Sequence, residues 1–348
     1  MTSPDTPAPG SELFTAPLWG DLEVRSALHP GTEAGRERNL RRLRGRRLFA
    51  DERAFDWYRS WDLEGLVGAV YPYVDDVGLD LCNYATTFMT VYDDQFEGTS
   101  ATASAEAAAE VRTCLGVIDE RTDVPATSPL TGIFAEIWHE WLRAGLSAEW
   151  HARVRTDWVY CLTSMAHERV ALRTGKPLLL DQYLWLRRGT SYMPLFLDLI
   201  ELAGGRECPR IAFHAPPLQI MRCITMDVVN YMNDVLSLHK EMARGDNDNI
   251  VLTLQGTYGC SLDEAISRVC ASVREQVRRF TELHGRLPEM CADLGLSREE
   301  TEAVLGYGHG LECWIGGYDP WQRSSARYTT AFAQRPADQR WAFRMGRT

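Results

Sequence analysis

The chain has 348 residues, 45% of them hydrophobic and 24% charged, a composition typical of a soluble globular protein. Its 37 basic and 48 acidic residues give a formal net charge of −11, which repels a polyphosphate backbone, so nucleic acid is not an expected partner. No stretch without charged residues reaches the roughly 18 to 20 apolar residues of a membrane-spanning helix, which excludes an integral membrane protein.

The ends of the chain and its cysteines indicate where the protein works. Residues 1–14 lack a basic start followed by an apolar core, so no signal peptide is expected and the predicted location is the cytoplasm. Nine cysteines are scattered without a CxxC pair, which favours reduced core thiols over a disulfide framework or a zinc site. Only Lys176 and Lys240 among the basic residues are lysines, a bias that indicates a GC-rich, bacterial genome.

The predicted organisation is one large domain. We expect residues 1–20 to be disordered, residues 21–335 to form the domain and residues 336–348 to form a polar tail. Within it, residues 35–47 carry seven arginines and alternate with leucines in a way that predicts an amphipathic helix with a solvated basic face. Contact with phosphate groups or with nucleic acid is the alternative interpretation of those arginines.

Helical periodicity dominates the rest of the chain. Apolar residues recur at a spacing of three to four, as in Ile133, Ile137 and Trp141, whereas alternating strand patterns are absent. Turn-forming residues predict breaks at residues 122–129, 175–177, 204–217 and 245–249. The predicted fold class is therefore all-α, a single-domain helical bundle without a sheet.

An acidic segment follows an uncharged helical stretch at residues 81–92. On a helix, Asp93 and Glu97 lie one turn apart on the same face with Asp94 adjacent, so their charges repel each other and oppose the helix dipole. A bound cation would relieve this repulsion, and oxygen ligands of this kind suit Mg²⁺. The alternative is a solvated acidic helix end.

A second polar stripe lies on a largely apolar helix at residues 226–241. Asn233, Ser237 and Glu241 are spaced four residues apart, so an amide oxygen, a hydroxyl and a carboxylate fall on one face within about two turns. This donor set fits a single octahedral cation. Three polar side chains on a solvated face are the alternative interpretation.

Together the two motifs, about 140 residues apart, resemble the aspartate-rich motif and the Asn/Ser/Glu triad of class I terpene synthases (terpene cyclases) of bacterial type. Two further segments are similar to that family. Arg187, 46 residues before Asn233, matches its diphosphate-sensing arginine, and Arg327 and Tyr328 match its closing Arg-Tyr pair. The resemblance runs from about residue 50 to residue 330 and implies the α-helical bundle of the class I terpene synthases.

For the polar residues the resemblance implies a trinuclear Mg²⁺ site that binds a prenyl diphosphate. Two of the three ions would be held mainly by Asp93, with Asp94 and Glu97 in outer or closing roles, and the third by Asn233, Ser237 and Glu241. The diphosphate would accept hydrogen bonds from Arg187, Lys240, Arg327 and Tyr328, with Arg188 as the alternative sensor.

For the hydrocarbon end the resemblance implies a dry apolar cavity. Gly189 and Pro194 predict a helix break after the sensor arginine, and a carbonyl among residues 189–192, with Ser191 favoured, would face the breaking bond. Aromatic rings stabilise positive charge through their faces. The candidates for such rings are Phe88, Tyr92, Trp185, Trp314 and Trp321.

The implied activity is that of a terpene cyclase, a carbon-oxygen lyase that ionises a linear prenyl diphosphate and cyclises the allylic cation. Farnesyl diphosphate is the favoured substrate, and geranylgeranyl diphosphate is the alternative. An isoprenyl diphosphate synthase would need a second aspartate-rich motif, where this chain has Asn233-Asp234-Val235-Leu236-Ser237. A non-catalytic helical scaffold is the remaining alternative, and a homodimer is left open.

Overall fold

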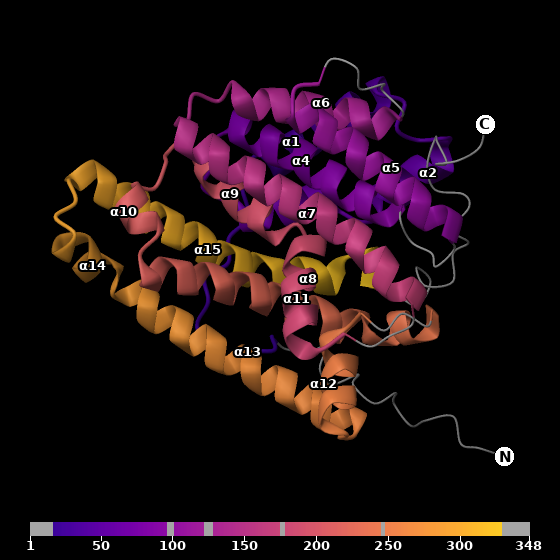
Figure 1. The fold of residues 1–348 in the computed structure, drawn as a ribbon. Coiled ribbons are helices and arrows are strands. Elements are labelled where there is room, and N and C mark those ends of the chain that lie inside the picture. The colour runs from indigo at the N-terminus through magenta and orange to yellow at the C-terminus, as the bar shows by residue number, and fades with distance from the viewer. Residues whose placement is uncertain (1–16, 96–100, 122–127, 175–177, 245–247, 329–348) are drawn as a thin grey trace.

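The structure is a computed structural model, and it describes residues 17–95, 101–121, 128–174, 178–244 and 248–328. All regular secondary structure in these residues is helical (Figure 1). The α-helices are α1 (Thr32–Gly45), α2 (Glu52–Arg59), α3 (Leu63–Val70), α4 (Asp76–Gln95), α5 (Ala101–Ile118), α6 (Pro129–Leu142), α7 (Ala148–Thr174), α8 (Leu180–Thr190), α9 (Met193–Gly204), α10 (Arg210–Phe213), α11 (Pro216–Arg244), α12 (Ile250–Tyr258), α13 (Leu262–Gly285), α14 (Leu287–Asp293) and α15 (Arg298–Ser324). A short 3₁₀ turn, η2 (Ala326–Tyr328), follows. The predicted all-α fold is confirmed.

Local sequence signals account for many helix boundaries. The Ser297 hydroxyl and the Glu300 carboxylate form a capping box at the start of α15, and Ser128 caps α6 ahead of Pro129. Gly205 and Gly259 end α9 and α12 in the left-handed conformation that glycine adopts without strain. The helices end at the four predicted breaks, although the short α10 within residues 204–217 was not predicted.

The helices surround a shared interior. α3 packs against α4 and α15, α15 packs against α11, and α9 packs against α4, α11 and α15. In Figure 1, α1, α4, α5 and α6 occupy the upper half and α11, α13 and α14 the lower half, with α9 and α15 between them. The two helices that carry the predicted metal motifs, α4 and α11, therefore lie on opposite sides of α9.

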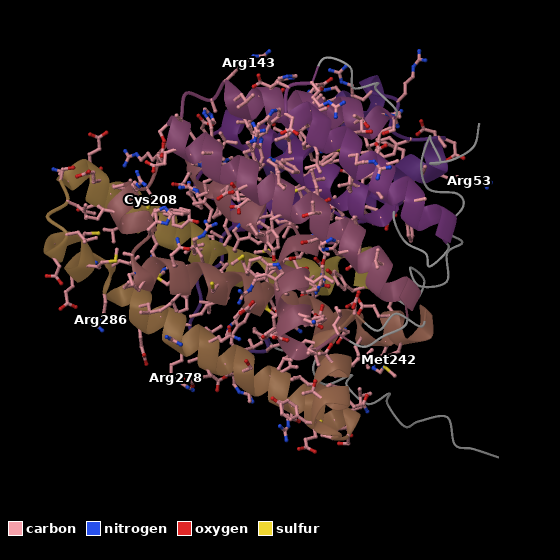
Figure 2. All side chains as sticks on the ribbon, in the orientation of Figure 1. Arg53, Arg143, Cys208, Met242, Arg278 and Arg286 are labelled. Carbon is pink, nitrogen blue, oxygen red and sulfur yellow. The ribbon has the colours of Figure 1, made fainter. Side chains whose placement is uncertain are left out.

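Apolar side chains fill the space between the helices, and the labelled arginines Arg53, Arg143, Arg278 and Arg286 lie at the periphery (Figure 2). α15 passes very close to the N-terminal part of the chain. A Cβ atom at Gly317 would lie 2.4 Å from the Ala69 carbonyl oxygen of α3, so only glycine permits this approach. All nine cysteines are free, as predicted. None of the described helices is long and apolar enough to cross a membrane.

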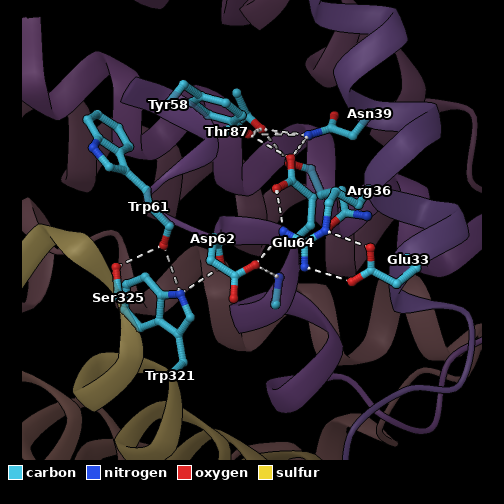
Figure 3. A network of polar contacts seen from close by, with 12 residues as sticks. Glu33, Arg36, Asn39, Tyr58, Trp61, Asp62, Glu64, Thr87, Trp321 and Ser325 are labelled. Atoms are coloured by element: carbon cyan, nitrogen blue, oxygen red, sulfur yellow. Dashed lines mark hydrogen bonds and ion pairs between the residues drawn. The ribbon is translucent and has the colours of Figure 1, made fainter. Parts of the chain in front are cut away.

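Two expectations for the N-terminal region need correction. Leu18 and Trp19 are buried in the core, so the packed part of the chain begins before the predicted boundary at residue 21. The basic face of α1 is only partly solvated, because Arg36, Arg38 and Arg42 pair with carboxylates of other helices. Figure 3 shows Arg36 between Glu33 and Asp62, beside the buried Glu64 carboxylate, which accepts from Asn39 and Tyr58.

Candidate active site

The predicted polar stripe is present on α11. The Ser237 hydroxyl donates to the Asn233 carbonyl at 2.8 Å, and the Glu241 carboxylate accepts from the Asn249 amide at 2.8 Å. Burial and the neighbouring Asp234 charge raise the pKa of Glu241 to about 7. Hydrogen bonds from Ser237 and Asn249 lower this pKa, but they offset only part of the rise. A partly buried carboxylate beside a second carboxylate is an environment that a bound cation stabilises.

The structure brings Arg187 to this stripe. Its Nη2 donates to Asn233 Oδ1 at 2.7 Å, and its Nε donates to Asp234 Oδ1 at 3.0 Å. Arg188 instead makes a two-pronged ion pair with Asp227, both bonds measuring 2.7 Å. Of the two candidate sensors, Arg187 is therefore the one beside Asn233, and the hydrogen-bonding fork of Arg188 is engaged elsewhere.

The C-terminal Arg-Tyr pair reaches the same asparagine. Asn233 Nδ2 donates to the hydroxyls of Tyr328 at 2.7 Å and Tyr318 at 2.9 Å, and the two hydroxyls are 3.1 Å apart. The Arg327 guanidinium carbon lies 4.4 Å from the centroid of the Trp61 ring. Arg187, Asn233 and Tyr328, from three distant parts of the chain, thus meet in one hydrogen-bonded cluster.

The turn before Tyr328 is held against the start of α3. The Trp61 carbonyl accepts from Ser325 Oγ at 2.9 Å and from Trp321 Nε1 at 3.1 Å (Figure 3). The same indole nitrogen lies 2.7 Å from the Asp62 carbonyl. These contacts position η2, and with it Arg327 and Tyr328, beside α11.

The predicted break after the sensor arginine is present. α8 ends at Thr190, and Tyr192 has a φ of 57°, in the left-handed region, before α9 begins at Met193. Hydrogen bonds at the break use the carbonyls of Arg187, Arg188, Gly189 and Tyr192. Pro194 has no N–H to donate to the Thr190 carbonyl, and within the described residues no hydrogen bond to the Thr190 or Ser191 carbonyl is present. This narrows the predicted set of residues 189–192 to two carbonyls, one of them Ser191.

Asp93 lies near this break. It is half-buried in the last turn of α4 and followed by the buried Asp94, whereas Glu97 lies outside the described residues. Burial raises the pKa of the Tyr192 hydroxyl well above its usual range, and the Asp93 charge adds to the rise. The aspartate-rich end of α4 and the start of α9 are therefore within electrostatic reach of each other.

Three of the five candidate aromatic residues pack outside this hydrogen-bonded cluster, and one of them, Trp185, does not fit its predicted role. Trp185 is 65% exposed and packs against Tyr160 of α7, so its ring cannot line a water-excluding cavity. Phe88 packs between α4, α6 and α7, with its ring centroid 5.3 Å from that of Phe134, and Tyr92 packs against Phe88. These rings form helix-helix core.

The other two aromatic residues lie on α15 near the cluster. Trp314 is buried and contacts the rings of Tyr71, Phe196 and Tyr318, and Trp321 contacts Tyr318 and Tyr328. Among the remaining candidates, Lys240 is half-buried beside Glu241. Gly189 has a packing role, because a Cβ atom there would lie 2.2 Å from Ser164 Oγ of α7.

Two residues that the sequence analysis did not select organise the site. Asp234 is fully buried and accepts from Arg187, from the Tyr183 hydroxyl and, at 2.8 Å, from the Ile250 amide. Asn249, also fully buried, donates from Nδ2 to the Asp234 carbonyl at 2.6 Å and to Glu241. Its position as the cap of an apolar helix was a readable signal, but its contact with Glu241 was not.

The donor set fits a hard divalent cation. Within the described residues no three His, Cys, Asp or Glu side chains form a metal-binding group. The α11 set depends on the oxygens of Asn233 and Ser237 beside Glu241, and the α4 set depends on Asp93 and Asp94 together with Glu97. All of these donors are oxygen atoms, which suits Mg²⁺ and does not suit zinc or copper.

Comparisons with known proteins agree with this geometry. A family model described as terpene synthase family 2, C-terminal metal binding, matches residues 84–279. Pristinol synthase of Streptomyces pristinaespiralis is 31% identical over 94% of this chain and 87% of its own, and the (2E,6E)-farnesyl diphosphate cyclizing 7-epi-alpha-eudesmol synthase of Streptomyces viridochromogenes is 30% identical over 89% and 92%. The crystal structure of germacradien-4-ol synthase from Streptomyces citricolor superposes with a TM-score of 0.79 at 26% identity, covering 89% of this chain and 99% of that one.

The fold and the site define a divalent-metal-dependent enzyme that acts on a prenyl diphosphate. The family model covers more than half of the chain, and both sequence relatives are more than four-fifths covered. The chain belongs to the terpene synthase family, and it is a terpene cyclase of bacterial type. The non-catalytic scaffold is thereby set aside.

We expect Asn249→Ala to weaken metal binding, because Asn249 orients the Glu241 carboxylate. The Mg²⁺ concentration for half-maximal diphosphate release should rise about 10- to 100-fold, the effect typical of losing a hydrogen bond to a metal ligand. Calorimetric titration with Mg²⁺ and inorganic diphosphate should show the same loss without turnover. Asn249→Ser, which retains a capping oxygen, is the control for helix capping, and an unchanged Mg²⁺ requirement in Asn249→Ala would contradict the assigned role.

Proposed function

We propose that this protein ionises farnesyl diphosphate with the help of three Mg²⁺ ions and cyclises the resulting cation to a sesquiterpene. The observation that carries the proposal is the cluster in which Arg187 and Tyr328 both contact Asn233 of α11. The farnesyl substrate printed for the eudesmol synthase relative supports the C15 chain length.

Six residues would hold the metal ions. Asp93, with Asp94 and Glu97, would bind two of them from α4, and Asn233, Ser237 and Glu241 would bind the third from α11. Bound Mg²⁺ would neutralise charge that develops on the departing diphosphate, so the carbon-oxygen bond breaks without an acid. The net charge of −11 is then no obstacle to an anionic substrate.

The diphosphate would be bound by Arg187, Lys240, Arg327 and Tyr328. Arg187 and Tyr328 also link diphosphate binding to Asn233, because each is hydrogen-bonded to Asn233 in this structure. When they turn to the diphosphate, Asn233 Oδ1 loses its N–H donor and becomes available as a ligand. Binding of substrate and of the third cation is therefore coupled through Asn233, and each strengthens the other.

The hydrocarbon chain would extend away from Asn233 toward α9 and α15. There the carbonyls of Thr190 and Ser191 at the helix break present partial negative charge, and the Trp314 ring is buried against Phe196. Carbonyl dipoles and aromatic faces both stabilise a cation without reacting with it. Exclusion of bulk water by the packed helices keeps the cation from indiscriminate hydrolysis.

Incubation of the purified protein with Mg²⁺ and the C10, C15 and C20 prenyl diphosphates tests the proposal. We expect diphosphate release to be fastest with the C15 substrate, and gas chromatography with mass spectrometry should detect a cyclic product. Faster turnover of the C20 substrate would favour the diterpene alternative. Chain elongation with isopentenyl diphosphate would identify an isoprenyl diphosphate synthase, and release from none of the substrates would refute the proposal.

A further inference from the structure

A buried amide side chain lies on α11 one turn before the stripe formed by Asn233, Ser237 and Glu241. Asn230 lies three residues before Asn233 and seven before Ser237, so its side chain projects from the same face, one turn deeper. Asn230 is 3% exposed, and its Nδ2 has no hydrogen-bond partner among the described residues. Buried amide donors in native proteins are nearly always satisfied, and where protein groups do not serve them, an ordered water does.

Neighbouring polar side chains on α11 have protein partners. Asp227 is paired with Arg188, and Asp234 with Arg187, so both hold α11 against α8. The Thr225 hydroxyl donates to the Met221 carbonyl of its own helix at 3.0 Å. Asn230 differs from them because its Nδ2 has no such partner among the described residues, and it faces the same side as the metal triad.

The α4 metal stripe has the same property. Thr86 precedes Asp93 by seven residues, which places both on one face of α4. Thr86 is 1% exposed and its Oγ1 has no hydrogen-bond partner within the part of the chain that the structure describes, whereas the adjacent Thr87 makes the usual bond to the carbonyl four residues earlier, at 2.9 Å. Each helix that carries a metal motif thus has a buried, unsatisfied polar group one or two turns before the motif, and α9 packs against both helices.

We propose that Asn230 holds a water molecule that captures the carbocation, so that the product is a terpene alcohol. This inference rests on the proposed function, because the cation must form beside the water. The water oxygen donates an electron pair to the cationic carbon and forms the C–O bond. One of its protons then passes to the diphosphate, which left with the electron pair of the broken bond. Prenyl diphosphate and water give alcohol and hydrogen diphosphate.

The test is turnover of the C15 substrate in H₂¹⁸O, with products identified by mass spectrometry. The wild-type protein should yield mainly an alcohol that carries ¹⁸O. Asn230→Leu should lower the ratio of alcohol to hydrocarbon at least tenfold, because leucine cannot hold the water by a hydrogen bond. Thr225→Val, which removes a buried hydroxyl from another face of α11, is the matched control and should leave the ratio unchanged.

Several outcomes would overturn the inference. Diphosphate release with only hydrocarbon products from the wild-type protein would refute water capture while leaving the proposed function standing. An alcohol whose proportion is unchanged in Asn230→Leu would refute the role of Asn230. If circular dichroism shows that the leucine variant does not fold, the ratio of alcohol to hydrocarbon is measured in Asn230→Ala instead. Absence of diphosphate release from the C10, C15 and C20 substrates would refute the proposed function itself, and the inference with it.

Discussion

Replacing Asn233 with alanine is expected to abolish turnover, a loss of at least about 1000-fold in diphosphate release. The change removes the proposed ligand of the third cation and, with it, the amide that links Arg187 to Tyr328. The fold should survive, because Arg187 keeps its ion pair with Asp234 and the two tyrosine hydroxyls keep their mutual contact. Glu241→Ala should behave in the same way.

Diphosphate release and thermal melting followed by circular dichroism measure the two effects separately. Gln219→Ala is the matched control, because it removes an amide from the same helix, about 21 Å from Asn233 along the axis. That variant should remain active. Substantial activity in Asn233→Ala or Glu241→Ala would show that the α11 triad is misassigned.

Arg187→Lys should lower kcat/KM for diphosphate release about 100-fold or more while the protein stays folded. Lysine retains the positive charge, but one ammonium group cannot span Asn233 and Asp234 as the guanidinium does. Arg187→Met should additionally destabilise the fold by about 3 to 5 kcal/mol, because it leaves the fully buried Asp234 without its cation.

A double variant separates these two effects of Arg187. In the double variant Arg187→Met with Asp234→Asn, the buried negative charge of residue 234 is removed, but its side-chain oxygen can still accept from the Ile250 amide. Stability measured by urea unfolding should therefore recover, whereas activity should remain lost. Recovery of activity in the double variant would mean that Arg187 serves the fold alone. Arg188→Met offers a comparison, since its partner Asp227 lies off the Asn233 cluster.

Helix periodicity was sufficient to predict the polar stripe on α11. Asn233, Ser237 and Glu241 needed only a continuous helix at residues 226–241 to fall on one face, and α11 provides it. The same argument, applied to the aromatic candidates, places two of them on other faces of their helices. Trp185 lies roughly 160° around α8 from Arg187, and Phe88 roughly 140° around α4 from Asp93, so neither shares a face with the polar residue that suggested it.

The contacts that assemble the site could not be predicted in this way. Asn249 reaches Glu241, and Tyr318 reaches Asn233, only because α12 and α15 pack against α11. The choice between Arg187 and Arg188 likewise depended on which of two α11 carboxylates, Asp234 or Asp227, each arginine meets across the α8–α11 interface.

Residue spacing along single helices was enough to establish the all-α class, the family resemblance, the breaks between helices and the oxygen donors for a metal ion. These features are local, since hydrogen bonding within a helix and the repeat of 3.6 residues per turn set them within a few turns. The meeting of Arg187, Asn233 and Tyr328, the buried positions of Asp234 and Asn249, and the unsatisfied Asn230 emerged from packing between helices. Such contacts join residues as far apart as Asn233 and Tyr328, which are separated by 95 positions, and side-chain packing across interfaces selects them with no periodic trace in the sequence.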